Sequence, residues 1–145
     1  MLDQQTCLIV DDSDVVRKIM RNTVEGLGFQ ADDVGSVQEA RLRCKRRLPD
    51  LILLDWHVPG EDPLDFLAAV RSMPKGRNVK IIYVVTDNDP AEIGRAIAGG
   101  ADDTLVKPFY RVNLETKVAA LTAPIGQTQD DIGYYRPVKV MSGER

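Results

Sequence analysis

The chain has 145 residues, of which 43% are hydrophobic and 28% are charged, and its formal net charge is -3. This balance is typical of one globular domain that is long enough to bury a core. It argues against a nucleic-acid binder, which presents a strongly basic face, so no DNA partner is expected. No apolar run approaches the roughly 20 residues that cross a bilayer, and no secretion signal is visible. With Cys7 and Cys44 isolated and expected to be free thiols, we predict a cytoplasmic protein without membrane contact.

Short apolar runs alternate with longer segments of helical period between residues 6 and 121. The best of these runs are apolar on both faces, as strands of a parallel sheet covered on both sides should be. They are Thr6–Val10, Leu51–Leu54, Val79–Val85 and Thr104–Val106, with a weaker strand at Gln30–Val34 that the alternation requires. The helical segments are Asp14–Leu27, Val37–Leu48, Pro63–Ser72, Pro90–Ala98 and Val112–Leu121. The pattern predicts an α/β fold: a flavodoxin-like, doubly wound, five-stranded parallel sheet of order 2-1-3-4-5 with five helices.

Local signals predict where the helices end and which faces they bury. Gly28 should stop the first helix, and the Gly99-Gly100 pair should end the fourth. The first helix carries an apolar stripe that should face the core, formed by Val15, Val16, Ile19, Met20, Val24 and Leu27.

The alternation stops at Pro124, and the stretch from Pro124 to the last residue contains two Pro, three Gly and scattered polar residues. We therefore expect residues 1–123 to form the domain. Residues 124–145 should form a C-terminal tail that is either flexible or binds a partner.

Acidic residues follow two of the predicted strands. Asp11 and Asp12 come after Thr6–Val10, and Asp55 comes after Leu51–Leu54. In such sheets ligands bind at the carboxyl ends of the strands where the winding reverses, and strands 1 and 3 are neighbours there. The three carboxylates should therefore converge, and they repel one another unless a cation lies among them. Oxygen ligands that leave room for water suit Mg2+.

Thr86 and Lys107 stand at the ends of the fourth and fifth predicted strands and should face the same edge. A metal ion, an ammonium and a hydroxyl around one carboxylate are what phosphoryl transfer to that carboxylate requires. We therefore predict that Asp55 is a phosphoacceptor, with Lys107 and Mg2+ holding the phosphoryl oxygens.

The segments VDDS, LLDWHVPG, VVT and VKPF, in this order and spacing, closely resemble the receiver domain of bacterial two-component response regulators. The single-domain chemotaxis-regulator type is the nearest, and the resemblance covers roughly Thr6–Leu121. It implies that Asp12 ligates the metal directly and that Asp11 assists, through water. It also implies that the backbone carbonyl of His57 completes the metal shell beside Asp55.

The same resemblance implies a function. Thr86 and Lys107 would read the phosphoryl group, and the Lys107-Pro108 bond would be cis. A sensor histidine kinase or a phosphotransfer protein would phosphorylate Asp55, and the face formed by residues 90–121 would then change its affinity for a downstream protein. No DNA-binding or enzymatic domain follows in this sequence, and no general acid or base suggests a phosphatase. We therefore expect a stand-alone response regulator and not an enzyme.

Asp87 and Thr104 depart from the family's pattern. The residue after the switch Thr is usually small, whereas Asp87 would add a fourth carboxylate at the rim, repel small anionic phosphodonors and alter the dephosphorylation rate. Position 104 is commonly Tyr or Phe, which swings inward when Thr86 moves. Because Thr104 cannot fill that volume, Tyr83 and Tyr110 are the candidates to replace the aromatic in part.

Trp56 and His57 follow Asp55 in the predicted loop. We interpret Trp56 as a partly buried aromatic and not as a ligand platform. His57 is either an exposed side chain that modulates the access of water to the phosphoryl group, or a ligating or catalytic imidazole; we favour the first.

Two further features leave alternatives open. The basic run Arg41–Arg47 is either the solvated face of a helix, which we favour, or an interaction patch. In the tail, Tyr134, Tyr135 and Arg136 are either idle or bind a partner. As an alternative function they would bind cyclic di-GMP, with the tyrosines stacked on guanine and the arginine on phosphate.

Overall fold

The computed structural model describes residues 4–86 and 88–122. A parallel sheet of order β2-β1-β3-β4-β5 runs through the centre of this part of the chain. Its strands are β1 (Thr6–Val10), β2 (Gln30–Val34), β3 (Leu51–Asp55), β4 (Lys80–Val85) and β5 (Asp103–Val106). The predicted flavodoxin-like topology is therefore confirmed.

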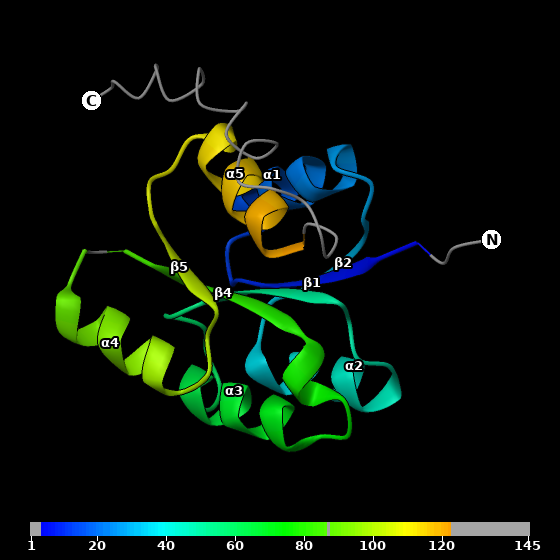
Figure 1. Cartoon of the computed structure of the whole chain (residues 1–145), viewed down its shortest axis with the longest axis vertical. Helices are drawn as coiled ribbons and strands as arrows, with labels where there is room; N and C mark the ends of the chain where they lie inside the picture. Colours follow the sequence, from blue (N-terminus) through cyan, green and yellow to red (C-terminus); the bar gives the residue numbers. More distant parts are fainter. Residues whose placement is uncertain (1–3, 87, 123–145) are drawn as a thin grey trace.

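Helices cover both faces of the sheet. In Figure 1, α1 and α5 lie above the strands, and α2, α3 and α4 lie below them. The helices are α1 (Asp14–Gly26), α2 (Val37–Arg46), α3 (Pro63–Ser72), α4 (Pro90–Ala98) and α5 (Arg111–Thr122). A short 3-10 helix that the sequence did not predict, η1 (Gly76–Asn78), leads into β4. None of the helices in the two described ranges is long and apolar enough to cross a membrane.

The strand side chains divide the core into two layers because successive residues point to opposite faces. Leu8, Ile52 and Leu54 belong to the core layer between the sheet and α2, α3 and α4. Ile9 and Leu53 belong to the core layer between the sheet and α1 and α5. This explains why the runs are apolar without alternation: both faces of each inner strand are covered.

Glycines end two of the helices as predicted. Gly28 has a φ of 99° and Gly100 a φ of 116°, a region that favours glycine. After α1, the amide of Gly28 donates to Glu25 and that of Phe29 donates to Val24. The same pair of hydrogen bonds follows α4. Both ends are Schellman motifs, in which the last carbonyls of the helix find donors.

The predicted core stripe of α1 is only partly correct. Met20 and Val24 are buried, and Val16 packs against their layer. Val15 is 67% exposed, and Ile19 is 48% exposed. Leu27, which lies just beyond the helix as its C-cap, is 38% exposed. Successive side chains on a helix point about 100° apart. A helix packed on a sheet therefore buries a narrower stripe than the apolar spacing in the sequence indicates.

Arg71, near the end of α3, ties together three segments that are far apart in the sequence. Its guanidinium donates to the carbonyl of Gly100 through Nε at 3.0 Å and Nη2 at 2.7 Å. Nη1 donates to the carbonyls of Gly76 at 2.8 Å and Val79 at 2.6 Å. Nη2 also lies 3.0 Å from an oxygen of Asp102. One side chain thus satisfies carbonyls before β4 and before β5.

We predict that Arg71→Ala lowers the free energy of unfolding by about 3 kcal/mol, because each hydrogen bond to a charged group contributes roughly 1.5–3 kcal/mol and several are lost. Arg71→Lys should recover only part of the loss, since an ammonium lacks the planar fork. Urea unfolding followed by circular dichroism measures this. Exposed Arg77 provides the control, and Arg77→Ala should change stability by less than about 0.5 kcal/mol. Equal losses in the two alanine variants would contradict the role of Arg71.

Candidate functional site

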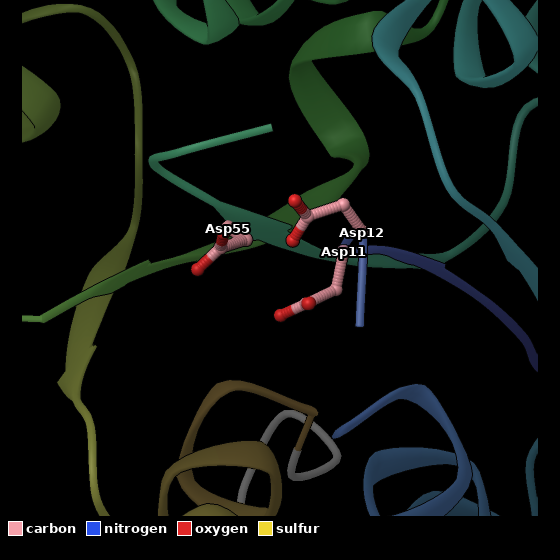
Figure 2. Close-up of side chains that lie close together, drawn as sticks. All are labelled: Asp11, Asp12 and Asp55. Atoms are coloured by element: carbon pink, nitrogen blue, oxygen red, sulfur yellow. The ribbon is translucent and has the colours of Figure 1, made fainter. Parts of the chain in front are cut away.

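Three carboxyl groups meet at the carboxyl ends of β1 and β3. The strands are direct neighbours, with Val10 paired to Leu54, so the residues that follow come together. Asp11 is fully buried and Asp55 is 3% exposed, whereas Asp12 lies at the surface. One oxygen from each lies within 4.8 Å of the others (Figure 2). Such a set of oxygen ligands fits a hard divalent cation such as Mg2+.

Lys107 reaches this cluster from the end of β5. Its Nζ donates a 2.8 Å hydrogen bond to Asp11 Oδ2 and lies 3.0 Å from Asp55 Oδ1. Burial favours a lower pKa for Lys107, but the attraction of the two neighbouring carboxylates outweighs it and the pKa is raised. Burial raises the pKa of Asp55, and Lys107 opposes this effect. The site therefore holds the Lys107 ammonium beside the Asp55 carboxylate, whose negative charge it offsets only in part.

The oxygens of Asp11 and Asp55 are occupied to different degrees. Asp11 uses both, since Oδ1 accepts from the amide of Ser13 at 2.9 Å and Oδ2 accepts from Lys107. Asp55 Oδ2 accepts from the amide of His57 at 3.3 Å. Asp55 Oδ1 is the only buried side-chain oxygen or nitrogen without a hydrogen bond in the described ranges, because Lys107 close by is poorly aligned with it. A buried acceptor without a donor is costly, and a cation at this oxygen would relieve that cost.

Thr86, at the end of β4, is held by an interaction that sequence reasoning missed. The indole Nε1 of Trp56 donates a 2.8 Å hydrogen bond to Thr86 Oγ1. The amide of Trp56 also donates to the carbonyl of Val84, which fixes the start of the loop. The sequence contained only a weak indication of this hydrogen bond. A partly buried indole usually finds an acceptor, but the position of Trp56 in the chain does not identify that acceptor.

His57 has an exposed side chain, as we favoured, and its ring lies 5.3 Å from the ring of Trp56. The metal-ligating group found in the described residues contains Asp11, Asp12 and Asp55 and does not include the imidazole. The role of the His57 carbonyl remains a prediction. The expected cis bond between Lys107 and Pro108 is present.

Tyr83 and Tyr110, the candidates to replace the missing aromatic, lie in different environments. Tyr83 pairs with Thr104 across β4 and β5 and is 1% exposed. Its hydroxyl donates to Glu92 of α4 at 3.2 Å, and burial raises its pKa to about 12. Tyr110 is 60% exposed. Tyr83 is thus fixed between the sheet and α4, and only Tyr110 is free of the core.

Four residues with predicted roles lie outside the described residues: Asp87, Tyr134, Tyr135 and Arg136.

Comparison with known proteins agrees with this geometry. Residues 7–119 match the family model of the response regulator receiver domain. The chain is 34% identical over 113 residues to the phosphate regulon transcriptional regulatory protein PhoB of Rhizobium meliloti, covering 78% of this chain and 50% of that protein. It is 33% identical over 115 residues to a chemotaxis protein CheY homolog of Campylobacter jejuni, covering 77% of this chain and 87% of that protein.

Solved structures give the same result. A putative response regulator from Chloroflexus aurantiacus superposes with a TM-score of 0.78 at 29% identity, covering 84% of this chain and all of that one (100%). The chemotaxis response regulator CheY4 of Vibrio cholerae superposes with a TM-score of 0.77 at 25% identity, covering 82% and 99%.

A buried aspartate at the end of β3, a carboxylate pair after β1 and a lysine after β5 are thus arranged on the fold of a known signalling module. The chain belongs to the response regulator receiver domain family of two-component systems. It spans about half the length of the PhoB relative and most of the chemotaxis homolog.

We predict that Asp12→Ala abolishes Mg2+ binding, because Asp12 contributes the exposed carboxylate of the cluster. Titration with MgCl2, followed by the fluorescence of Trp56, measures this, and labelling of Asp55 by acetyl phosphate should be lost in parallel. Asp14→Ala, which removes a carboxylate that is 91% exposed two residues away, should retain both properties. Normal labelling of the Asp12→Ala protein would disprove the assignment.

Proposed function

We propose that this chain is a phosphorylation-controlled signalling switch in which Asp55 accepts a phosphoryl group from a sensor histidine kinase or a phosphotransfer protein. The observation that carries the proposal is the unbonded Oδ1 of Asp55, buried between Lys107 and the other two carboxylates. That oxygen would form the new bond to phosphorus while the bond to the donor's leaving group breaks.

The residues around Asp55 take the roles that their positions favour. Lys107 would turn from the two carboxylates to the oxygens of the phosphoryl group. Asp12, Asp55 and the carbonyl of His57 would hold Mg2+, with Asp11 orienting Lys107 and a ligating water. When bound, Mg2+ would supply positive charge against the charge of the transferring phosphoryl group.

An apolar groove beside the site supports docking of a protein donor. It has a volume of about 370 Å³ and is lined by Val16, Ile19, Thr86, Lys107, Pro108 and Phe109. Ile19, which the core stripe was wrongly predicted to bury, lines this groove and is 48% exposed. Val15, wrongly predicted to be buried as well, is exposed on the same helix. Apolar side chains around the entrance to a charged site favour contact with another protein surface.

Output would pass through the face formed by α4, β5 and α5, where Ile97 and Tyr110 are exposed. We propose a stand-alone regulator that acts in the cytoplasm by protein contact. Buried, unpaired Cys7 and Cys44 agree with a reducing compartment. No observation on the described residues favours the alternative of cyclic di-GMP binding.

The proposal is tested by phosphorylation of the full chain with acetyl phosphate or a histidine kinase, followed by intact-mass measurement. Asp55→Asn should lose the phosphoryl mass completely. Asp65→Asn, which changes an exposed carboxylate on α3, should keep it. A pull-down with the phosphorylated chain against Asp55→Ala would then identify the downstream protein. Labelling that persists in Asp55→Asn would refute the function.

We also predict that Trp56→Phe makes the phosphorylated conformation easier to reach. If the Thr86 hydroxyl turns to the phosphoryl group, it must leave the indole of Trp56, and that hydrogen bond is worth about 1 kcal/mol. Beryllofluoride, a phosphoryl analogue, should therefore bind the variant about fivefold more tightly in a fluorine NMR titration. Tyr110→Phe, which removes a hydroxyl from an exposed ring, should bind it like the parent protein. Unchanged or weaker binding by Trp56→Phe would show that the indole does not restrain Thr86.

A further inference from the structure

Basic side chains without an ion-pair partner gather at the end of the sheet opposite to Asp55. In the described ranges, the arginines and lysines with no carboxylate within 4.0 Å are Lys18, Lys45, Arg46, Arg47, Lys75, Arg77 and Lys80. All but Lys18 belong to the end of α2 or to the segment that leads from α3 into β4. The amino-terminal end of the sheet therefore carries an uncompensated positive charge, although the chain as a whole is acidic.

Four of these cations surround a groove with an apolar lining. The groove has a volume of about 580 Å³ and lies between the end of α2 and the loop after α3. Lys45, Arg46, Arg47 and Lys75 border it, and its remaining lining comes from Cys44, Leu48, Met73 and Pro74. Arg46 and Arg47 also border a second hollow of about 350 Å³ beside β1 and β2. The two arginines thus stand between two depressions and face both.

Lys75 has a backbone conformation that a lysine adopts only at a cost. Its φ of 68° is the only positive value at a non-glycine residue in the described ranges. The tight turn beside it needs glycine at position 76, where a Cβ would lie 1.8 Å from the carbonyl oxygen of Val70. Glycine would suit position 75 as well, so the backbone does not call for a lysine there. What the lysine adds is a charge at the rim of the groove.

The chemistry of the groove selects one class of ligand. Its cations favour an anion, and its aliphatic and sulfur side chains, above all the adaptable Met73, favour apolar groups. No aromatic side chain lines it, so nucleic-acid bases would find no stacking surface. None of the exposed large hydrophobic residues borders it, so a bilayer would gain no inserted anchor. An acidic protein segment that also carries apolar side chains fits both properties.

We propose that this groove, bordered by Lys45, Arg46, Arg47 and Lys75, docks an acidic and apolar segment of a partner protein. β3 runs from the end that carries the groove to Asp55, and its four residue steps span about 13 Å. Docking there leaves the face of α4, β5 and α5 free and is independent of phosphorylation. It would hold a partner near the switch in both of its states.

The test uses the full chain and a short fluorescent peptide in which Asp and Leu alternate, with anisotropy as the readout. Two matched peptides, with Asn in place of Asp or Ser in place of Leu, should bind at least about tenfold more weakly. Lys75→Gly should weaken binding of the Asp-Leu peptide about threefold without lowering the melting temperature, because glycine accepts the positive φ. Arg46→Ser with Arg47→Ser should weaken it about tenfold. Lys18→Ala, which removes an unpaired cation elsewhere, should have no effect.

Equal affinity in Lys75→Gly, in the double arginine variant and in the parent protein would overturn the proposal. So would equal binding of the Ser-containing peptide, or tighter binding of phosphatidylserine vesicles or of single-stranded DNA. If the variant with both Asp130→Asn and Asp131→Asn bound the peptide more tightly, the occupant of the groove would instead be the chain's own tail. If the chain self-associated in sedimentation, the occupant would be a second copy of the chain. Affinity should be the same for Asp55→Asn and for the phosphorylated chain. A difference would also contradict the proposal, whereas failure of Asp55 to label would refute only the proposed switch.

Discussion

Two buried carboxylates share one ammonium at the carboxyl edge of the sheet, and the rest of the site depends on that shortage of positive charge. Asp11 and Asp55 are held by rigid apolar strands and cannot move apart to reach water. Lys107 hydrogen-bonds to Asp11 and leaves one oxygen of Asp55 without a donor. A low-dielectric site with this imbalance favours an incoming cation. The fold thus leaves Asp55 short of positive charge before any ligand binds.

The two ends of the sheet have opposite chemistry although one set of strands forms both. The carboxyl ends carry the carboxylates, and the amino-terminal end carries the unpaired cations of α2 and of the loop after α3. Arg71 joins that loop to the loop before β5, so the basic end has a fixed frame. Because the strands lie between the two ends, a ligand at one end would leave the other end free to hold a partner. This separation would suit a switch that stays tethered.

The connection from the site to α4 differs from the aromatic movement that the family's pattern implies. Thr86 is tied to the indole of Trp56 on the neighbouring strand end, and Tyr83 is tied to Glu92 of α4. Tyr83 also lies beside Thr104, where an aromatic is common in the family. A movement of the Thr86 side chain would therefore break its hydrogen bond with Trp56 first. A movement of α4 would strain the hydrogen bond between Tyr83 and Glu92. The first hydrogen bond joins the segments that follow β3 and β4, and the second joins β4 to α4.

The sequence by itself determined the strands, the helices and the meeting of Asp11, Asp12, Asp55 and Lys107 at one edge. Apolar runs and helix-ending glycines act locally, and the order of a doubly wound sheet then brings the strand ends together. Only the tertiary structure decided that Val15 and Ile19 are exposed, that Trp56 holds Thr86 and that Lys75 adopts a positive φ. Each of these depends on how a side chain or a turn meets elements distant in the chain. Local pattern carries no information about such contacts, because they arise from packing between elements and not from the preferences of one segment.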